Sequence, residues 1–140
     1  MSKIILCLLI CISSISFAAE GVQLRVNLID NQITQVAVVN KPGMPIKLKI
    51  NFCIDTIGML DLIIKDSNDK VHRLDAMINE RCNFDREVLL GSSESISRLF
   101  TLYELQEYYG LVPGEYKISA KLCPDPTGCI VSNEIIVKIP

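Results

Sequence analysis

Tryptophan is absent from this 140-residue chain, histidine occurs once, and basic residues do not outnumber acidic ones. Fourteen Lys and Arg residues stand against sixteen Asp and Glu residues, which leaves a formal net charge of -2. Without a basic excess to pair with phosphates, the chain is a poor candidate for nucleic-acid binding. Hydrophobic residues make up 49% of the chain and charged residues 21%, which excludes a disordered protein. The length predicts one domain.

The first residues have the pattern of a signal peptide. Met1–Lys3 form a short positive start, and residues 4–15 are almost wholly apolar. Small residues then flank Phe17 in the run Ser16-Phe17-Ala18, where signal peptidase needs small side chains, so we expect cleavage after Ala18. The apolar run of about 12 residues is shorter than the ~20 that cross a bilayer. A retained transmembrane helix is therefore not expected.

The predicted organisation is a signal peptide at 1–18 followed by one domain at 19–140. The mature chain contains no apolar run of membrane-spanning length, so we expect a periplasmic or secreted protein without a membrane span. Two alternatives exist for the first segment, a buried core helix and lipid attachment at Cys11. Lipid attachment is disfavoured because Ile10, just before the cysteine, is not small.

Four cysteines remain after cleavage, namely Cys53, Cys82, Cys123 and Cys129. An even number in an exported domain indicates disulfide bonds, with three connectivities open. Residues 124–128 are turn-forming and bring their ends together, which favours Cys123–Cys129 and leaves Cys53–Cys82 by elimination. A zinc site is the rival interpretation, but structural zinc ligands are usually paired with two to four residues between them. Here five and 28 residues intervene, so no metal or other cofactor is expected.

Apolar and polar residues alternate along most of the mature chain. Alternation, strict at 46–54 and repeated at 116–122 and 135–139, predicts strands with one face on a core. Shorter candidate strands are 22–28, 33–39, 60–65, 71–76 and 96–102. Turn-forming residues separate them, and the only helix expected is a short one at 102–109. Seven or eight short strands at this spacing predict an all-β fold, an antiparallel β-sandwich.

Two segments carry a resemblance to known domains. The run LGSSESISRLF at 90–100, followed by YYGLVPGEYKI at 108–118, resembles a phrase of immunoglobulin-like domains in exported bacterial proteins. It is also similar to the sandwich region that precedes the catalytic part of deuterolysin-type metallopeptidases. The match spans about a quarter of the mature chain and implies an immunoglobulin-like sandwich. The metallopeptidase motif His-Glu-x-x-His is absent, so the resemblance implies no protease activity.

The positions of the cysteines in the strand alternation predict where the disulfide bonds lie. Cys53 and Cys123 fall on the strand face opposite the expected core residues. An immunoglobulin-type bridge between sheets would place its cysteines on the core face, usually beside a tryptophan. We therefore expect peripheral bonds near strand ends.

Catalytic patterns are missing from the sequence. His72 has no recognisable nucleophile or orienting acid, and we expect it to face solvent on a strand. Asp66, Asn68 and Asp69 match a hairpin turn better than a calcium loop, because the spacing and the terminal Glu of such a loop are lacking. Two pairs of acidic residues are Asp61 with Asp75 and Glu104 with Glu107. A catalytic pair of carboxylates needs surroundings that give the two groups different pKa values, and the sequence around these pairs indicates none. We therefore expect no enzyme.

Two segments are candidate binding surfaces. Tyr103, Tyr108 and Tyr109 lie close together in a segment rich in aromatic residues, and at least one of them should be exposed. The alternative is that this segment is a crossover that buries most of its area. Asp125 and Thr127 lie in the loop between Cys123 and Cys129, which is either a rigid recognition tip or only a stapled turn.

These features leave two functions from different classes. The first is an exported protein-binding module of the inhibitor, immunity or envelope-complex type, whose partner is another protein of the envelope or extracellular space. The second is a structural surface-assembly or pilus-like subunit that acts through pairing of an edge strand. Oligomeric state separates them, because self-association through an edge strand favours the second.

Overall fold

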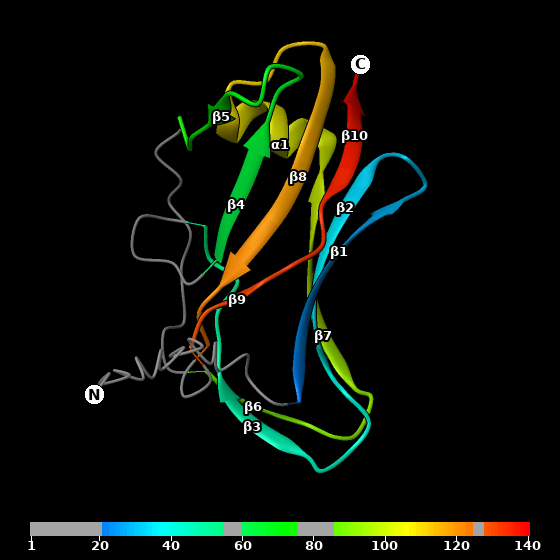
Figure 1. The fold of residues 1–140 in the computed structure, drawn as a ribbon, viewed down its shortest axis with the longest axis vertical. Coiled ribbons are helices and arrows are strands. Elements are labelled where there is room, and N and C mark those ends of the chain that lie inside the picture. The colour runs from blue at the N-terminus through cyan, green and yellow to red at the C-terminus, as the bar shows by residue number, and fades with distance from the viewer. Residues whose placement is uncertain (1–20, 55–59, 76–85, 125–127) are drawn as a thin grey trace, which may run out of the picture.

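The first sheet of the sandwich contains β1 (Val22–Ile29), β2 (Ile33–Asn40) and β7 (Ser95–Thr101) in the order β1-β2-β7, with antiparallel neighbours. In this computed structural model the described residues are 21–54, 60–75, 86–124 and 128–140 (Figure 1). The turn that joins β1 to β2 places Asp30 and Asn31 at positive φ values of 50° and 55°. Such turns match the right-handed twist of a two-stranded hairpin, and Asp and Asn tolerate this backbone conformation best after glycine.

The second sheet is built from five strands. They are β4 (Leu60–Lys65), β5 (Val71–His72), β8 (Gly114–Leu122), β9 (Ile130–Val131) and β10 (Ile135–Ile139). The order is β10-β8-β4-β5, and β9 pairs with the end of β8. All of these pairs are antiparallel, so the described chain forms the two layers of an all-β sandwich.

A third, two-stranded sheet continues the first one past a bend. It pairs β3 (Ile46–Lys49) with β6 (Glu87–Leu90), the segments that follow β2 and precede β7 in the chain (Figure 1). Asn40 lies at the bend with only 2% of its surface exposed, and its backbone N donates to Glu94 O at 2.9 Å. Its side-chain Nδ2 lies 3.0–3.1 Å from the carbonyl oxygens of Met44, Leu90 and Gly91.

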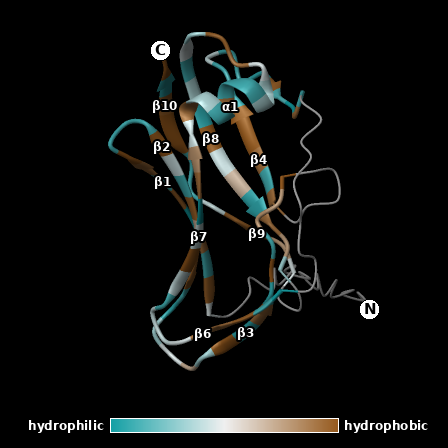
Figure 2. Ribbon diagram, turned by 180° about the vertical axis from the view of Figure 1, so that it is seen from behind, coloured by the Kyte–Doolittle hydropathy of each residue, from teal (hydrophilic) through white to brown (hydrophobic). Residues whose placement is uncertain are grey.

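Residues at every second position of the strands form the core between the sheets. Its fully buried large side chains include Val26, Val36, Val38, Phe100, Leu48, Ile50, Ile64, Ile118, Leu122, Val137 and Ile139. Figure 2 shows hydrophobic and hydrophilic residues alternating along the strands. The helix α1 (Leu102–Tyr109) follows β7 directly and adds Leu105 and Tyr109 to this core. The predicted all-β sandwich is therefore confirmed.

Several element boundaries agree with the sequence-based prediction, and others do not. The strands at 60–65 and 135–139 and the helix at 102–109 have the predicted bounds. The described residues contain ten strands rather than seven or eight, because β6 and the two-residue β9 were not expected. The strand predicted at 71–76 pairs only at Val71–His72, and residue 76 lies outside the described residues.

The strand predicted at 46–54 ends at Lys49, and this corrects the expected position of Cys53. Asn51 Oδ1 accepts a hydrogen bond from Cys53 N at 3.2 Å, a local turn that interrupts the alternation. Ile50 and Asn51 are consequently both buried. Cys53 is 8% exposed and belongs to the buried residues, so the prediction that it points away from the core is wrong.

Candidate functional site

The tyrosine-rich segment forms a helix with defined ends. Thr101 is the N-cap: its Oγ1 accepts from Glu104 N at 3.1 Å, while Glu104 Oε2 accepts from Thr101 N at 2.7 Å. This reciprocal capping box satisfies two backbone N–H groups that the first turn of a helix leaves without partners. Gly110 ends the helix at φ 59°, a left-handed conformation that glycine adopts without steric strain. The helix is therefore fixed at both ends.

The three candidate tyrosines lie in different environments. Tyr109 is buried with 5% of its surface exposed, and Tyr108 is partly buried against the core. Tyr103 is 65% exposed. The expectation that at least one of the three is exposed is confirmed, and the rest of the segment covers one end of the core. The aromatic candidate surface is therefore reduced to Tyr103 and its neighbours on α1.

The ring of Tyr103 is held in place by the next turn of the helix. Its hydroxyl donates a hydrogen bond to Glu107 Oε1, four residues along the same helix face. The carboxylate accepts this proton and adds its negative charge, so it raises the pKa of the Tyr103 hydroxyl above its ordinary value. An exposed aromatic ring with a fixed orientation loses little freedom when a partner covers it.

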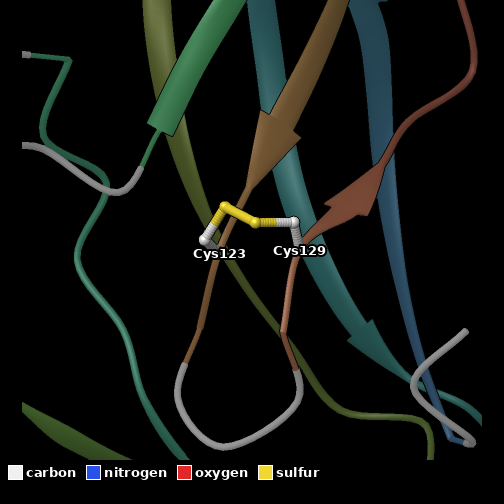
Figure 3. The surroundings of a disulfide bond; sticks show 2 residues. All are labelled: Cys123 and Cys129. Atoms are coloured by element: carbon white, nitrogen blue, oxygen red, sulfur yellow. A yellow bond between two sulfur atoms is a disulfide. The ribbon is translucent and has the colours of Figure 1, made fainter. Parts of the chain in front are cut away.

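The second candidate surface lies beyond the end of β8. Cys123 and Cys129 form a disulfide bond that joins the end of β8 to the start of β9 (Figure 3). This pairing and its place near a strand end agree with the prediction. Asp125 and Thr127 lie outside the described residues, so their roles remain predictions. Cys53 is also disulfide-bonded, and Cys82, its expected partner, lies outside the described residues as well.

His72 lies beside a cavity of about 430 Å³ next to β4 and β5. Its side chain is only 20% exposed and meets the ring of Tyr116 edge-on at 5.4 Å, so the expectation that it faces solvent is wrong. His72 Nε2 lies 3.5 Å from Asp66 Oδ2, a contact too long for a good hydrogen bond. Among the described residues that line the cavity there is no Ser, Thr or Cys to act as a nucleophile.

The acidic turn between β4 and β5 uses its carboxylates locally. Asp66 Oδ1 accepts from Asn68 N at 2.8 Å and from Lys70 N at 3.1 Å, which lowers the pKa of Asp66. Asp69 pairs with Lys117 Nζ at 2.9 Å, and this pairing lowers the pKa of Asp69. Within the described ranges, no three His, Cys, Asp or Glu side chains gather closely enough to hold a metal ion.

An asparagine joins the two sheets where β1 meets the segment before β10. Asn133 Oδ1 accepts from Val26 N at 3.0 Å, and Asn133 Nδ2 donates to Val26 O at 2.8 Å. The amide therefore takes the place of a neighbouring strand at the outer edge of β1. We call this contact the seam. No local sequence pattern predicts this contact, because residues 26 and 133 are far apart along the chain.

Beyond the seam, β1 and β10 enclose a groove of about 470 Å³. Its lining consists of Leu28, Asn31, Ile136, Lys138 and Pro140. Ile136 is 60% exposed, an uncommon degree for a large apolar side chain on a strand. The alternation of apolar and polar residues predicted the strand β10. Its position in the sheet comes from the strand pairing: among the described residues β8 is its one partner, so β10 is the last strand of the second sheet.

No protein-family model matches this sequence, and a search of curated proteins found no match. In the part of the chain that the structure describes, no helix is long and apolar enough to cross a membrane. The candidate surfaces therefore stand on their own geometry. They are the Tyr103 face of α1 and the free edge of β10.

Proposed function

We propose that this chain is an exported protein-binding module with no catalysis of its own. It acts in the periplasm or outside the cell, as an inhibitor, an immunity factor or a subunit of an envelope complex. The disulfide bond between Cys123 and Cys129 supports an oxidising compartment, where such bonds form and persist. The predicted signal peptide at 1–18 is the second argument for export.

The exposed ring of Tyr103 is the observation that carries the proposal. Tyrosine is enriched among the residues that dominate protein interfaces, because it offers a large rigid area with a polar tip. Here the ring stands on a helix capped at both ends, and Glu107 fixes its hydroxyl. We therefore place the partner protein over the Tyr103 face of α1.

Truncation of this ring tests the proposal. Partner proteins are recovered from an envelope extract with the immobilised wild-type chain, and the affinity of each is measured by titration. Tyr103→Ala should weaken binding of the specific partner about 30-fold or more, as expected of an interface hot spot. Tyr103→Phe keeps the ring and should retain most of the affinity.

A matched control is Val131→Ala, which truncates an equally exposed apolar side chain on β9. This variant should bind like the wild type. If Tyr103→Ala binds every recovered partner with unchanged affinity, the Tyr103 face is not the binding surface. Asp125→Ala and Thr127→Ala then test the loop between the cysteines in the same way, without touching the disulfide bond.

A second candidate function is favoured by the free edge of β10. A strand at the edge of a sheet presents unpaired backbone groups to any extended segment that approaches it. The groove beside Ile136 and Lys138 leaves this edge accessible. The chain would then serve as a structural surface-assembly or pilus-like subunit that associates by edge-strand pairing.

A further inference from the structure

The hydrogen bonds of Ala120 show which side of β8 faces β9 and β10. Ala120 O accepts from Ser132 N, and Ala120 N donates to Ser132 Oγ, both at 2.8 Å. Backbone groups alternate between the two sides of an antiparallel strand. Ile118 and Tyr116, two and four residues before Ala120, therefore direct their N–H and C=O groups towards β10 as well.

The same alternation identifies the unpaired groups of β10. Ile135 and Val137 are the partners of Ile118 and Tyr116, so their backbone groups point back to β8. Ile136 lies between them and Lys138 follows, so both direct N–H and C=O to the outer edge. Among the described residues, no hydrogen bond reaches these outer groups.

Among the described residues, β1 makes no backbone hydrogen bond to this edge. Asn133 binds Val26 at the seam, and further residues of β1 lie near β10. Farther along, β10 and the turn after β1 lie on opposite sides of the groove, and in Figure 1 they diverge towards the C-terminus. The outer groups of Ile136 and Lys138 thus lie beside the groove.

Side chains on the solvent face of this edge form a symmetric pattern. Glu134, Ile136 and Lys138 are all exposed and stand two residues apart, with the apolar residue between opposite charges. The pKa of Lys117, the pairing partner of Ile136 on β8, is raised mainly by Asp69 and further by Glu134. Glu134 therefore lies near enough to this edge to act on its charges.

We infer that two copies of this chain pair antiparallel along β10, with Ile136 opposite Ile136 of the second copy. This register places Glu134 of each copy opposite Lys138 of the other. The two-fold axis passes through the Ile136 pair. The five-stranded sheet of one copy and that of the other then join into one continuous sheet. The interface is isologous, because the same edge serves both copies. The inference deepens the second candidate function by naming the occupant of the edge.

The charges select this register among those that the backbone allows. A shift by one residue would oppose outward-facing groups to inward-facing ones, so no ladder would form. Shifts by an even number of residues preserve the hydrogen-bond ladder. They place Lys138 opposite Lys138, place Glu134 opposite Glu134, or leave both charged residues without an oppositely charged partner. Opposite charges that face each other across strands stabilise a pair of strands, and like charges destabilise it. A lysine on an edge strand usually blocks association, whereas here Glu134 neutralises it.

Charge reversal at the edge tests the inference. The purified protein is sedimented at about 1 to 100 µM, and wild type should show a monomer–dimer equilibrium in this range. Lys138→Glu and Glu134→Lys each turn two attractive pairs into two repulsive ones. Each should weaken dimerisation at least about tenfold. The double variant Glu134→Lys with Lys138→Glu restores both pairs, and its dissociation constant should return to within about threefold of wild type.

Lys121→Glu is the matched control, because Lys121 is also exposed on the solvent face but lies on β8, opposite Val131. It should leave dimerisation unchanged, and thermal unfolding of all variants verifies that each is folded. A wild-type chain that remains monomeric at about 100 µM overturns the inference. A dimer that tolerates the single reversals, or that the double variant does not restore, overturns it equally.

The outcome is separable from that of the binding experiment. Tyr103 lies on α1 and takes no part in the β10 edge, so Tyr103→Ala should dimerise like the wild type. Lys138→Glu should in turn bind a partner of the Tyr103 face with unchanged affinity. Failure of one proposal therefore leaves the other standing.

Discussion

Asn40 and Asn133 perform the same task at two places that differ in burial. Each supplies hydrogen bonds that a continuous ladder of strands would otherwise provide: Asn40 at the bend between β2 and β3, and Asn133 at the seam beside β1. Asn40 is 2% exposed, and its amide serves carbonyl groups on both sides of the bend. Asn133 is exposed, and its bonds to Val26 are only partly buried.

Burial sets how much such a hydrogen bond contributes to stability. A polar group that loses its partner in the interior stays unsatisfied, whereas one near the surface binds water instead. The order of expected effects is therefore Asn40, then Asn133, then the exposed cap of α1, and last the surface ion pair of Asp69. Each of the following variants tests one place in that order.

Asn40→Ala should be the most destabilising of these variants. The carbonyl groups of Met44, Leu90 and Gly91 lose their shared donor inside the bend. We expect the free energy of unfolding to fall by about 2–4 kcal/mol, measured by urea denaturation. Asn27→Ala, at an exposed position on β1, is the control and should change stability by less than ~0.5 kcal/mol. A loss below ~1 kcal/mol for Asn40→Ala would contradict the burial argument.

Asn133→Ala should have an intermediate effect. Val26 loses both of its partners at the seam, but water can reach the exposed side. We expect a loss of about 1–2 kcal/mol and faster hydrogen exchange at the Val26 amide, followed by NMR. Asn133→Asp retains an oxygen that accepts from Val26 N, so that amide should stay more protected than in the alanine variant. Unchanged exchange in Asn133→Ala would show that the seam is not closed in solution.

Thr101→Ala removes the side-chain half of the capping box of α1. The N–H of Glu104 then loses its acceptor, and water replaces it because the site is exposed. The expected loss is about 1 kcal/mol in urea denaturation. Thr101→Ser keeps the hydroxyl and should stay close to the wild type. An effect as large as that of Asn40→Ala would argue against the proposed order.

Asp69 should contribute least, and its contribution should depend on pH. Lys117 lowers the pKa of Asp69 below its ordinary value of 3.8 in the folded state. The stabilisation is therefore present above that value and is lost as the pH falls through the lower pKa of the folded state. Asp69→Asn should reduce stability slightly at about pH 6, and the difference from wild type should shrink at about pH 2.5. A difference that grows on acidification would contradict this assignment.

Local patterns in the sequence were sufficient for most elements. Alternation located the strands at 60–65 and 135–139, and the one short helix expected, at 102–109, is α1. The prediction failed at Cys53, where the side chain of Asn51 redirects the backbone and shifts the alternation. It also failed for His72, which packs against Tyr116 from another strand. Both errors come from contacts that a periodicity does not record.

The sequence by itself determined the all-β class, the strand periodicity and the pairing of Cys123 with Cys129, because each depends on residues close together in the chain. Only the tertiary structure decided which strands lie at the edges, and that Tyr103 rather than Tyr108 or Tyr109 is exposed. It also brought Asn133 to Val26, 107 residues away. Contacts of this kind depend on how the sheets pack around a shared core. Apolar residues from any strand can fill that core, so the sequence pattern of each strand does not specify the order of the strands.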